Sequence, residues 1–131
     1  MKRGELSEKV IENQVLSWFK LHGIMAWKIK STATYDPTRG KFLKISPWYR
    51  RGCPDVLACY HGRLLGFEIK TKIGRLSEHQ KSFHEDLRRA GGLVYIVRDV
   101  SDLADIFREL KLSLRPGSNE PSQLQTNTSS E

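Results

Sequence analysis

The chain has 131 residues, of which 38% are hydrophobic, and this length predicts one globular domain rather than two. No apolar run approaches the roughly 18 residues of a membrane span, and the start of the chain has no signal-peptide core. We therefore expect no membrane partner and a location in the cytoplasm, of a bacterium or of a phage-infected host cell. The two cysteines, Cys53 and Cys59, form no disulfide framework and match no usual zinc spacing, so both are expected to be reduced and partly buried.

The net charge of +7 is concentrated in one part of the sequence. Residues 28–75 contain 11 basic and 3 acidic residues, whereas the remainder of the chain is almost balanced. A local excess of this kind favours a polyanionic partner, nucleic acid before membrane, because no basic amphipathic helix accompanies it. The alternative is a solvated basic surface that keeps the protein soluble.

The first element expected is a helix over residues 7–21, with Ser7 as its N-cap and His22-Gly23 as its end. Helical spacing places Glu12 inside the apolar stripe of this helix, and Glu8 lies on the same face one turn earlier. A carboxylate directed at a core needs a partner. One of these two acids is therefore a candidate functional residue.

Residues 24–30 then predict a strand, residues 35–40 a turn, and residues 41–45 a return strand, which together would form a basic hairpin. Residues 46–52 read as an irregular connection that carries two aromatic and two arginine side chains.

The second half predicts another hairpin from two apolar runs, residues 55–60 and 64–70. A helix opened by a Ser77 capping box and stopped by Gly91-Gly92 follows, then a strand over residues 93–97. Ser101 caps a last amphipathic helix. This order predicts an α/β fold with a mixed sheet flanked by helices on both faces, in one domain over residues 1–111, and a disordered polar tail over residues 112–131.

The register of the second hairpin brings two carboxylates together. If His61-Gly62 is its two-residue loop, residues whose numbers sum to 123 are opposite each other, so Asp55 faces Glu68, and Lys70 lies on the same face as Glu68. Like charges in such a position destabilise a sheet unless a cation such as Mg²⁺ neutralises them. The alternative is that Glu68 and Lys70 form a surface ion pair and that Asp55 caps a turn. The four histidines, His22, His61, His79 and His84, have no metal-ligand spacing and are interpreted as surface or turn residues.

Three short motifs occur in a specific order: Gly52-Cys53-Pro54-Asp55, then Glu68-Ile69-Lys70, then Gly74-Arg75-Leu76-Ser77 with Gln80 three residues later. Over roughly residues 7–100 this series resembles the VRR-NUC (virus-type replication-repair nuclease) group of the PD-(D/E)XK nuclease superfamily. The resemblance implies a restriction-endonuclease-like αβββαβ core, which agrees with the element order above.

The resemblance also implies a catalytic site. Asp55, Glu68 and the Ile69 carbonyl would bind Mg²⁺ or Mn²⁺, Lys70 would assist the attacking water, and Gln80 would complete the site. An alternative role for Gln80 is in the capping box with Ser77. The acid of the first helix is assigned to Glu12, with Glu8 as its rival.

The implied activity is that of a metal-dependent endodeoxyribonuclease that hydrolyses phosphodiester bonds. Small members of this family act as dimers on junctions, so we expect a homodimer and branched DNA such as Holliday junctions. The alternatives are a nucleic-acid-binding module without catalysis, or a nuclease that acts on linear duplex or RNA.

Basic and aromatic side chains around the motifs are candidates for contact with DNA. Trp48 or Tyr49 would stack on an unpaired base, unless Trp48 packs on the core and the lysines are merely solvated. The candidate phosphate contacts are Lys28, Lys30, Arg39, Lys41, Lys44, Arg50, Arg51, Lys72 and Arg75.

Overall fold

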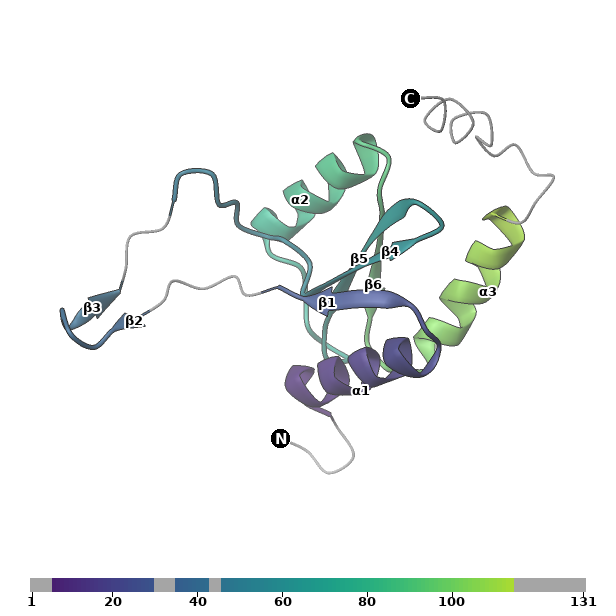
Figure 1. Ribbon diagram of the computed structural model, residues 1–131, viewed down its shortest axis with the longest axis horizontal. Helices are drawn as coiled ribbons and strands as arrows, with labels where there is room; N and C mark the ends of the chain where they lie inside the picture. The colour runs from purple at the N-terminus through teal and green to yellow at the C-terminus, as the bar shows by residue number, and fades with distance from the viewer. Residues whose placement is uncertain (1–5, 30–34, 43–45, 115–131) are drawn as a thin grey trace, which may run out of the picture. The chain divides into compact units, whose positions relative to one another are not determined.

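Three helices and six strands occur in the part of the chain that the computed structural model describes, residues 6–29, 35–42 and 46–114 (Figure 1). In chain order they are α1 (Glu8–Leu21), β1 (Met25–Lys28), β2 (Tyr35–Asp36), β3 (Lys41–Phe42), β4 (Val56–Tyr60), β5 (Arg63–Ile69), α2 (Glu78–Arg89), β6 (Leu93–Val97) and α3 (Asp102–Leu114).

Four of the strands form a mixed sheet in the order β1-β4-β5-β6. The pairs β1–β4 and β4–β5 are antiparallel, and β5–β6 is parallel. Parallel neighbours need a crossover connection, and α2 provides it between β5 and β6. The expected α/β class with a mixed sheet is therefore confirmed.

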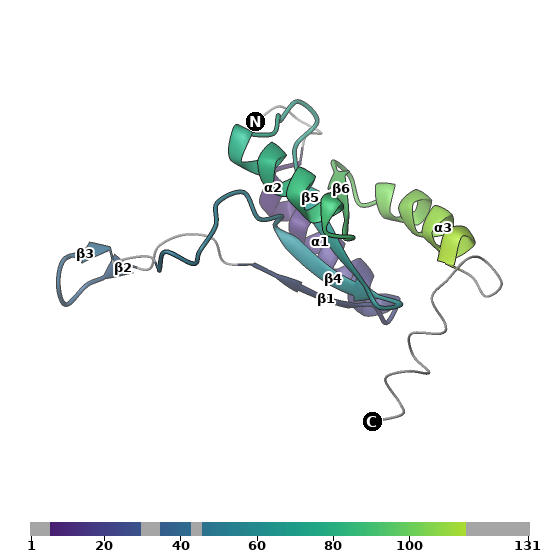
Figure 2. The same cartoon turned by 90° about the horizontal axis from the view of Figure 1, so that it is seen from above.

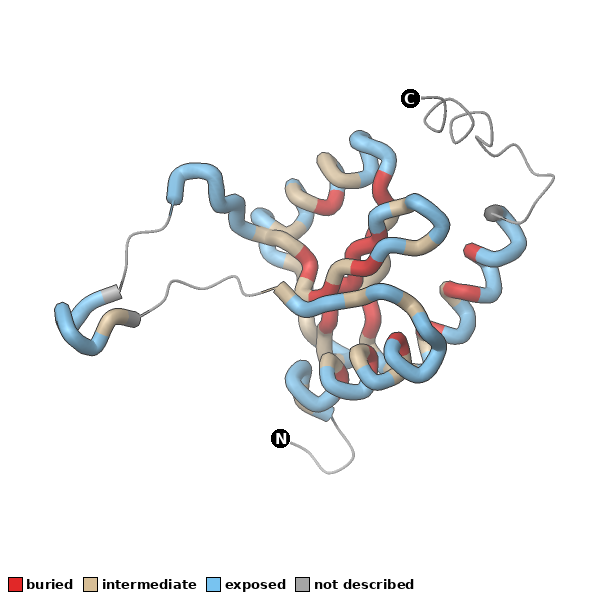
Figure 3. The backbone as a smooth tube through the Cα atoms, in the orientation of Figure 1, coloured by how far each residue is buried: buried red, intermediate tan, exposed pale blue. Residues whose placement is uncertain are grey.

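Helices α1 and α2 pack on opposite faces of this sheet because side chains alternate along β5. On one face, Phe67 lies against Phe19 of α1, with ring centroids 5.0 Å apart. On the other face, Leu87 of α2 lies close to Gly66. Figure 2 gives a second view of the two helices and the sheet. The buried residues of β4, β5 and α1, drawn in red in Figure 3, form the core between these elements.

The starts of α1 and α2 agree with their sequence signals. The Ser7 hydroxyl accepts a hydrogen bond from the Val10 backbone N–H at 3.2 Å, and α1 ends before Gly23, which has φ +68°. The Ser77 hydroxyl accepts from the Gln80 N–H at 3.2 Å, while the Gln80 side chain accepts from the Ser77 N–H at 2.9 Å. This capping box sets the start of α2 and, with it, the positions of all later residues on that helix.

The register expected for the β4–β5 hairpin is confirmed. Tyr60 faces Arg63 and Val56 faces Phe67, so the paired numbers sum to 123. The turn residues His61 and Gly62 both have positive φ, +50° and +79°, which is the geometry of a two-residue type I′ turn.

The expected hairpin between residues 24–30 and residues 41–45 is wrong. Strand β1 pairs with β4, not with residues 41–45, and β2 and β3 form a separate two-stranded sheet. The turn at residues 35–40 closes this small sheet locally, with the Gly40 N–H donating to the Asp36 carbonyl at 2.9 Å. Strand β4 instead offers β1 four paired residues next to the core, a longer and better-buried partner. Residues 43–45 of the expected return strand lie outside the described residues.

Helix α3 belongs to a second unit, which begins at Ser101. Its amphipathic pattern is confirmed, since Leu103, Phe107 and Leu110 are buried and Ile106 is half-buried. The helix includes residues 112–114, which the sequence assigned to the tail. The rest of that tail, residues 115–131, lies outside the described residues. No helix in the described ranges is long and apolar enough to cross a membrane.

Candidate metal and nucleic-acid site

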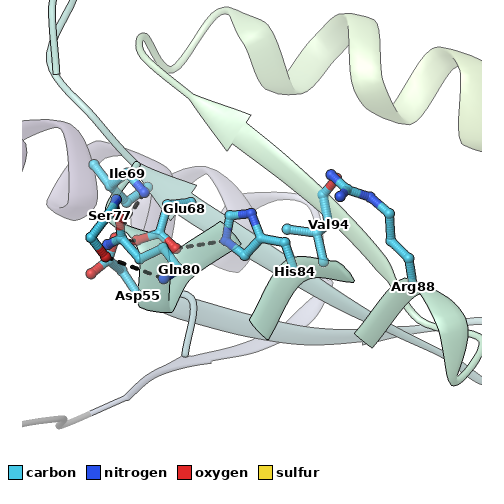
Figure 4. Close-up of polar contacts among 8 residues, drawn as sticks. All are labelled: Asp55, Glu68, Ile69, Ser77, Gln80, His84, Arg88 and Val94. Carbon is cyan, nitrogen blue, oxygen red and sulfur yellow. Dashed lines mark hydrogen bonds and ion pairs between the residues drawn. The ribbon is translucent and has the colours of Figure 1, made fainter. Parts of the chain in front are cut away.

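Asp55 and Glu68 meet at the end of the β4–β5 ladder, as the register predicts (Figure 4). Asp55 is fixed twice, since its Oδ2 accepts a hydrogen bond from the Ile69 N–H at 2.8 Å and its carbonyl accepts from the Ile29 N–H at 2.9 Å. Glu68 is only 1% exposed. Burial, a hydrogen bond with Asp55 and the charge of Asp55 together raise the pKa of Glu68 to about 9. At neutral pH the carboxyl group of Glu68 is therefore protonated.

Helix α2 holds both carboxyl oxygens of Glu68. Gln80 Nε2 donates to Oε2 at 3.0 Å, and His84 Nε2 lies 2.8 Å from Oε1 (Figure 4). Gln80 and His84 are four residues apart, so they lie on the same face of the helix. The carboxyl group is thus oriented from one rigid element, with each oxygen assigned to a different partner.

His84 is buried, at 2% exposure, so its interpretation as a surface or turn residue is wrong. Desolvation by burial, followed by the positive charges of Arg88 and Lys70, lowers its pKa, and the imidazole is neutral at neutral pH. The usable signal was the capping box: once Gln80 faces the sheet, the residue four positions later faces it too. The other three histidines are exposed, as expected.

The side chain of Gln80 combines the expected capping-box contact with a hydrogen bond to Glu68. Its Oε1 accepts from the Ser77 backbone while its Nε2 donates to Glu68. A glutamate, the usual alternative at this capping-box position, would offer Glu68 no donor. The choice of an amide at position 80 follows from this double contact.

Two motif residues that carry no chemistry position the loop before Asp55. Gly52 has φ +91°, and a Cβ there would overlap the His79 carbonyl in the first turn of α2. Pro54 is buried, and its Cγ would lie 2.8 Å from a Cβ added to Gly66. The loop that leads into Asp55 therefore rests directly on α2 and β5.

Lys70 lies directly after β5, where its N–H donates to the Val97 carbonyl at 3.0 Å. Its positive charge acts on Glu68, because it opposes the rise in the pKa of that carboxyl. The following turn is held by the Arg98 guanidinium, which donates to the carbonyls of Thr71, Lys72 and Gly74. A cation near the carboxyl pair is thus built into a fixed loop.

The two acids of α1 differ in what they contact. The buried Oε2 of Glu12 lies 3.1 Å from Lys28 Nζ of β1, an ion pair in which no donor is aligned for a hydrogen bond. Glu8 instead acts on the site, since its charge contributes to the raised pKa of Glu68. Glu12 is thus paired with Lys28, whereas the charge of Glu8 acts on Glu68.

Cys53 lies near the carboxyl pair and is half-buried. Burial and the charges of Glu68 and Asp55 raise the pKa of its thiol, which is therefore a neutral group at this position. Cys59 is exposed rather than partly buried as expected, and both cysteines are free.

The candidate phosphate contacts fall into two groups. Three have acidic partners: Lys28 with Glu12, Arg39 with Asp36 at 3.4 Å, and Arg50 with Asp86 at 2.6 Å. Four are exposed and form no ion pair within the described residues, namely Lys41, Arg51, Lys72 and Arg75. Lys30 and Lys44 lie outside the described residues.

The donor set of the carboxyl pair fits a hard divalent cation. Within residues 6–29, 35–42 and 46–114, no three His, Cys, Asp or Glu side chains form a metal-binding group. Mg²⁺ does not need such a group, since one or two carboxylates with water and substrate phosphates are its usual ligands in enzymes. A cation between Asp55 and Glu68 would replace the proton that Glu68 carries at neutral pH.

Comparison with models of known protein families gives no match for this chain. Comparison with curated proteins gives none either.

Proposed function

We propose that this protein is a metal-dependent DNA endonuclease with a restriction-endonuclease-like core. The elements before Ser101, apart from the small β2–β3 sheet, follow the order α1-β1-β4-β5-α2-β6. This is the αβββαβ order that the motif resemblance implies. The observation that carries the proposal is the meeting of Asp55 and buried Glu68 at the end of the β4–β5 ladder, where burial and Asp55 raise the pKa of Glu68 and the charge of Lys70 acts on the same carboxyl.

In this proposal Mg²⁺ or Mn²⁺, when bound, would polarise the scissile phosphate and acidify a water. Asp55 and Glu68, with the Ile69 carbonyl, would supply the oxygens that hold it. Lys70 would stabilise the charge that develops on the attacking water and the phosphate. Gln80 and His84 would keep Glu68 in one orientation, and Glu8 rather than Glu12 would contribute the acid of α1.

Branched DNA as substrate and a homodimer as the active form are carried by the motif resemblance. A monomer of this size covers too little DNA to recognise a four-way junction by itself. We therefore propose both together, with cleavage of four-way junctions as the activity to be tested first against linear duplex, single strands and RNA.

The test is cleavage of these four substrates in Mg²⁺ by the wild-type protein and by Asp55→Asn and Lys70→Met. We expect the wild type to cut junction DNA and each variant to lose at least about 10²-fold in rate, since each removes a group that acts on the transition state. Asp105→Asn is the matched control, because Asp105 is exposed in α3 and pairs with Arg108. If both variants cut at the wild-type rate, the assignment of the site is wrong.

One observation favours a second candidate, a nucleic-acid-binding module without catalysis. Burial and Asp55 raise the pKa of Glu68 to about 9, so this carboxyl is neutral at pH 7 and the fold does not depend on a cation. This candidate predicts DNA binding that is the same in Mg²⁺ and in a chelator, with no cleavage of any of the four substrates.

A further inference from the structure

Residues 46–52, here called the aromatic segment, expose two neighbouring aromatic rings to solvent. Trp48 is 92% exposed and Tyr49 is 72% exposed. The alternative in which Trp48 packs on the core is therefore wrong. Exposed large apolar side chains of this kind often mark a binding site, because their apolar surface gains free energy when it is covered.

Hydrogen bonds and the Arg50 side chain hold the backbone of the aromatic segment, whereas the rings of Trp48 and Tyr49 are exposed. The Ser46 hydroxyl accepts from the Trp48 N–H at 3.2 Å, and the Ser46 carbonyl accepts from the Tyr49 N–H at 3.0 Å. Arg50 then fastens the segment to α2, where it reaches Asp86 and lies 4.9 Å from the centre of the Phe83 ring. Two rigid rings are thus presented at little further cost in backbone entropy.

The segment is also tied to the candidate metal site. Gly52 rests on the first turn of α2, the turn that carries Gln80, and Asp55 follows three residues later. Tyr49 and Asp55 are six positions apart, a span of at most about 20 Å. A strand that ran from these rings toward the carboxyl pair would therefore reach it within a few nucleotides.

We propose that the aromatic segment binds unpaired bases of DNA, with Trp48 and Tyr49 as stacking surfaces and Arg51 as a phosphate contact. Stacking on aromatic rings beside cations is how single strands are held without sequence preference. A polyanionic strand fits this segment better than a protein partner does, because residues 46–52 contain two arginines and no acidic residue, and Arg51 is exposed. The proposal rests on the proposed nuclease function and specifies the part of the substrate that its site would receive.

The test measures binding in a chelator, so that it does not depend on cleavage. Fluorescence anisotropy compares a blunt duplex with the same duplex that carries a single-stranded extension, for the wild type, Trp48→Ala, Tyr49→Ala and Trp48→Phe. Ile73→Ala is the control, since Ile73 is an exposed apolar residue outside the segment, at 82% exposure. A 2-aminopurine placed in the extension reports stacking directly.

We expect each alanine variant to lose about tenfold or more in affinity for the extended DNA and little for the blunt duplex. Trp48→Phe and Ile73→Ala should bind as the wild type does, and the 2-aminopurine signal should change only with an aromatic residue at position 48. Equal binding of both DNAs by all variants overturns the inference. So does a change in self-association of Trp48→Ala without a change in DNA binding.

The outcome for the aromatic segment is separable from that for the nuclease. If the wild type cleaves DNA in Mg²⁺ while the alanine variants bind extended DNA normally, the segment has no such role and the nuclease proposal stands. If extended DNA binds through Trp48 but no substrate is cleaved, the stacking site stands and the nuclease proposal falls.

Discussion

At the scale of single residues, the carboxyl group of Glu68 is the most constrained group of the site. It is buried, contacts Gln80 and His84, and has a raised pKa because of burial and of Asp55. Such a group is costly to ionise in the absence of a cation and is stabilised in its ionised form when one binds. The protonation of Glu68 and the loading of the site are therefore coupled.

This coupling predicts how stability changes with pH. In the folded chain the pKa of Glu68 is about 9, whereas its unperturbed value is 4.5. Between these values the folded state keeps a proton that the unfolded state has lost, so stability falls as pH rises through this window. From pH 7 to pH 9 in a chelator, we expect the free energy of unfolding to fall by about 1 kcal/mol per pH unit, measured by urea denaturation.

Glu68→Gln is the control for this slope, since an amide resembles the protonated acid and does not titrate. The difference between the two slopes of unfolding free energy against pH gives the contribution of Glu68 alone. Addition of Mg²⁺ should also raise the stability of the wild type more at pH 9 than at pH 7. Identical slopes in the two proteins would contradict the raised pKa.

His84 gives a second prediction at this scale. His84→Leu removes the partner of a buried carboxyl oxygen, so the free energy of unfolding should fall by about 1–3 kcal/mol. Loss of this orienting contact should also weaken Mn²⁺ binding by about 10- to 100-fold, as measured by titration calorimetry. His84→Gln can still donate a hydrogen bond to Glu68 and should recover much of the Mn²⁺ affinity. A histidine with only a packing role would show the stability loss without this recovery.

At the scale of secondary-structure elements, the site depends on how closely the loop before β4 approaches α2. Gly52→Ala combines a disfavoured positive φ with an overlap against the His79 backbone. Gly62→Ala has a comparable φ, +79°, but nothing lies within 4 Å of the added Cβ. We expect the Gly52 variant to lose more stability, by about 1–3 kcal/mol beyond the Gly62 variant, in the same denaturation assay.

The two variants should also differ in function. A shift of the loop moves Asp55 relative to Gln80, so Gly52→Ala should lower the cleavage rate even where the protein remains folded. Gly62→Ala leaves that approach unchanged and should cut at nearly the wild-type rate. The reverse order of the two effects would show that this contact does not position Asp55.

Local signals were sufficient to predict most elements and the pairing of β4 with β5. The helix caps and the two-residue turn at His61-Gly62 each act within a few residues, and the turn alone fixes which residues face each other. Strand β1 was paired wrongly because its true partner is about 30 residues away and a local turn offered a nearer one. His84 was missed because its environment is created by α2 folding onto β5, which spacing from other histidines cannot reveal.

At the scale of the whole molecule, the net charge of +7 does not act as a uniform surface. Arg50 fastens the aromatic segment to α2, and its contact lowers the pKa of Asp86. Lys41, Arg51, Lys72 and Arg75 are exposed and form no ion pair with the described acids. Under the proposed function, these four exposed cations, and not Arg50, would contact phosphates and release counterions from DNA.

The salt dependence of DNA binding tests this division. Arg75→Ala should reduce the slope of log K against log salt by about 1, because one phosphate contact is lost. Arg50→Ala should leave this slope unchanged and lower the midpoint of thermal unfolding, because it breaks a contact within the protein. Equal effects of the two substitutions on the slope would contradict the division.

The proposed function requires that Asp55 and Glu68 together hold a divalent cation. A calorimetric titration of the wild type and of Asp55→Asn with Mn²⁺ at pH 8, each with and without four-way-junction DNA, tests this directly. We expect saturable binding by the wild type and a loss of at least about tenfold in affinity for the variant. Absence of Mn²⁺ binding by the wild type under both conditions, or equal binding by the variant, would contradict it.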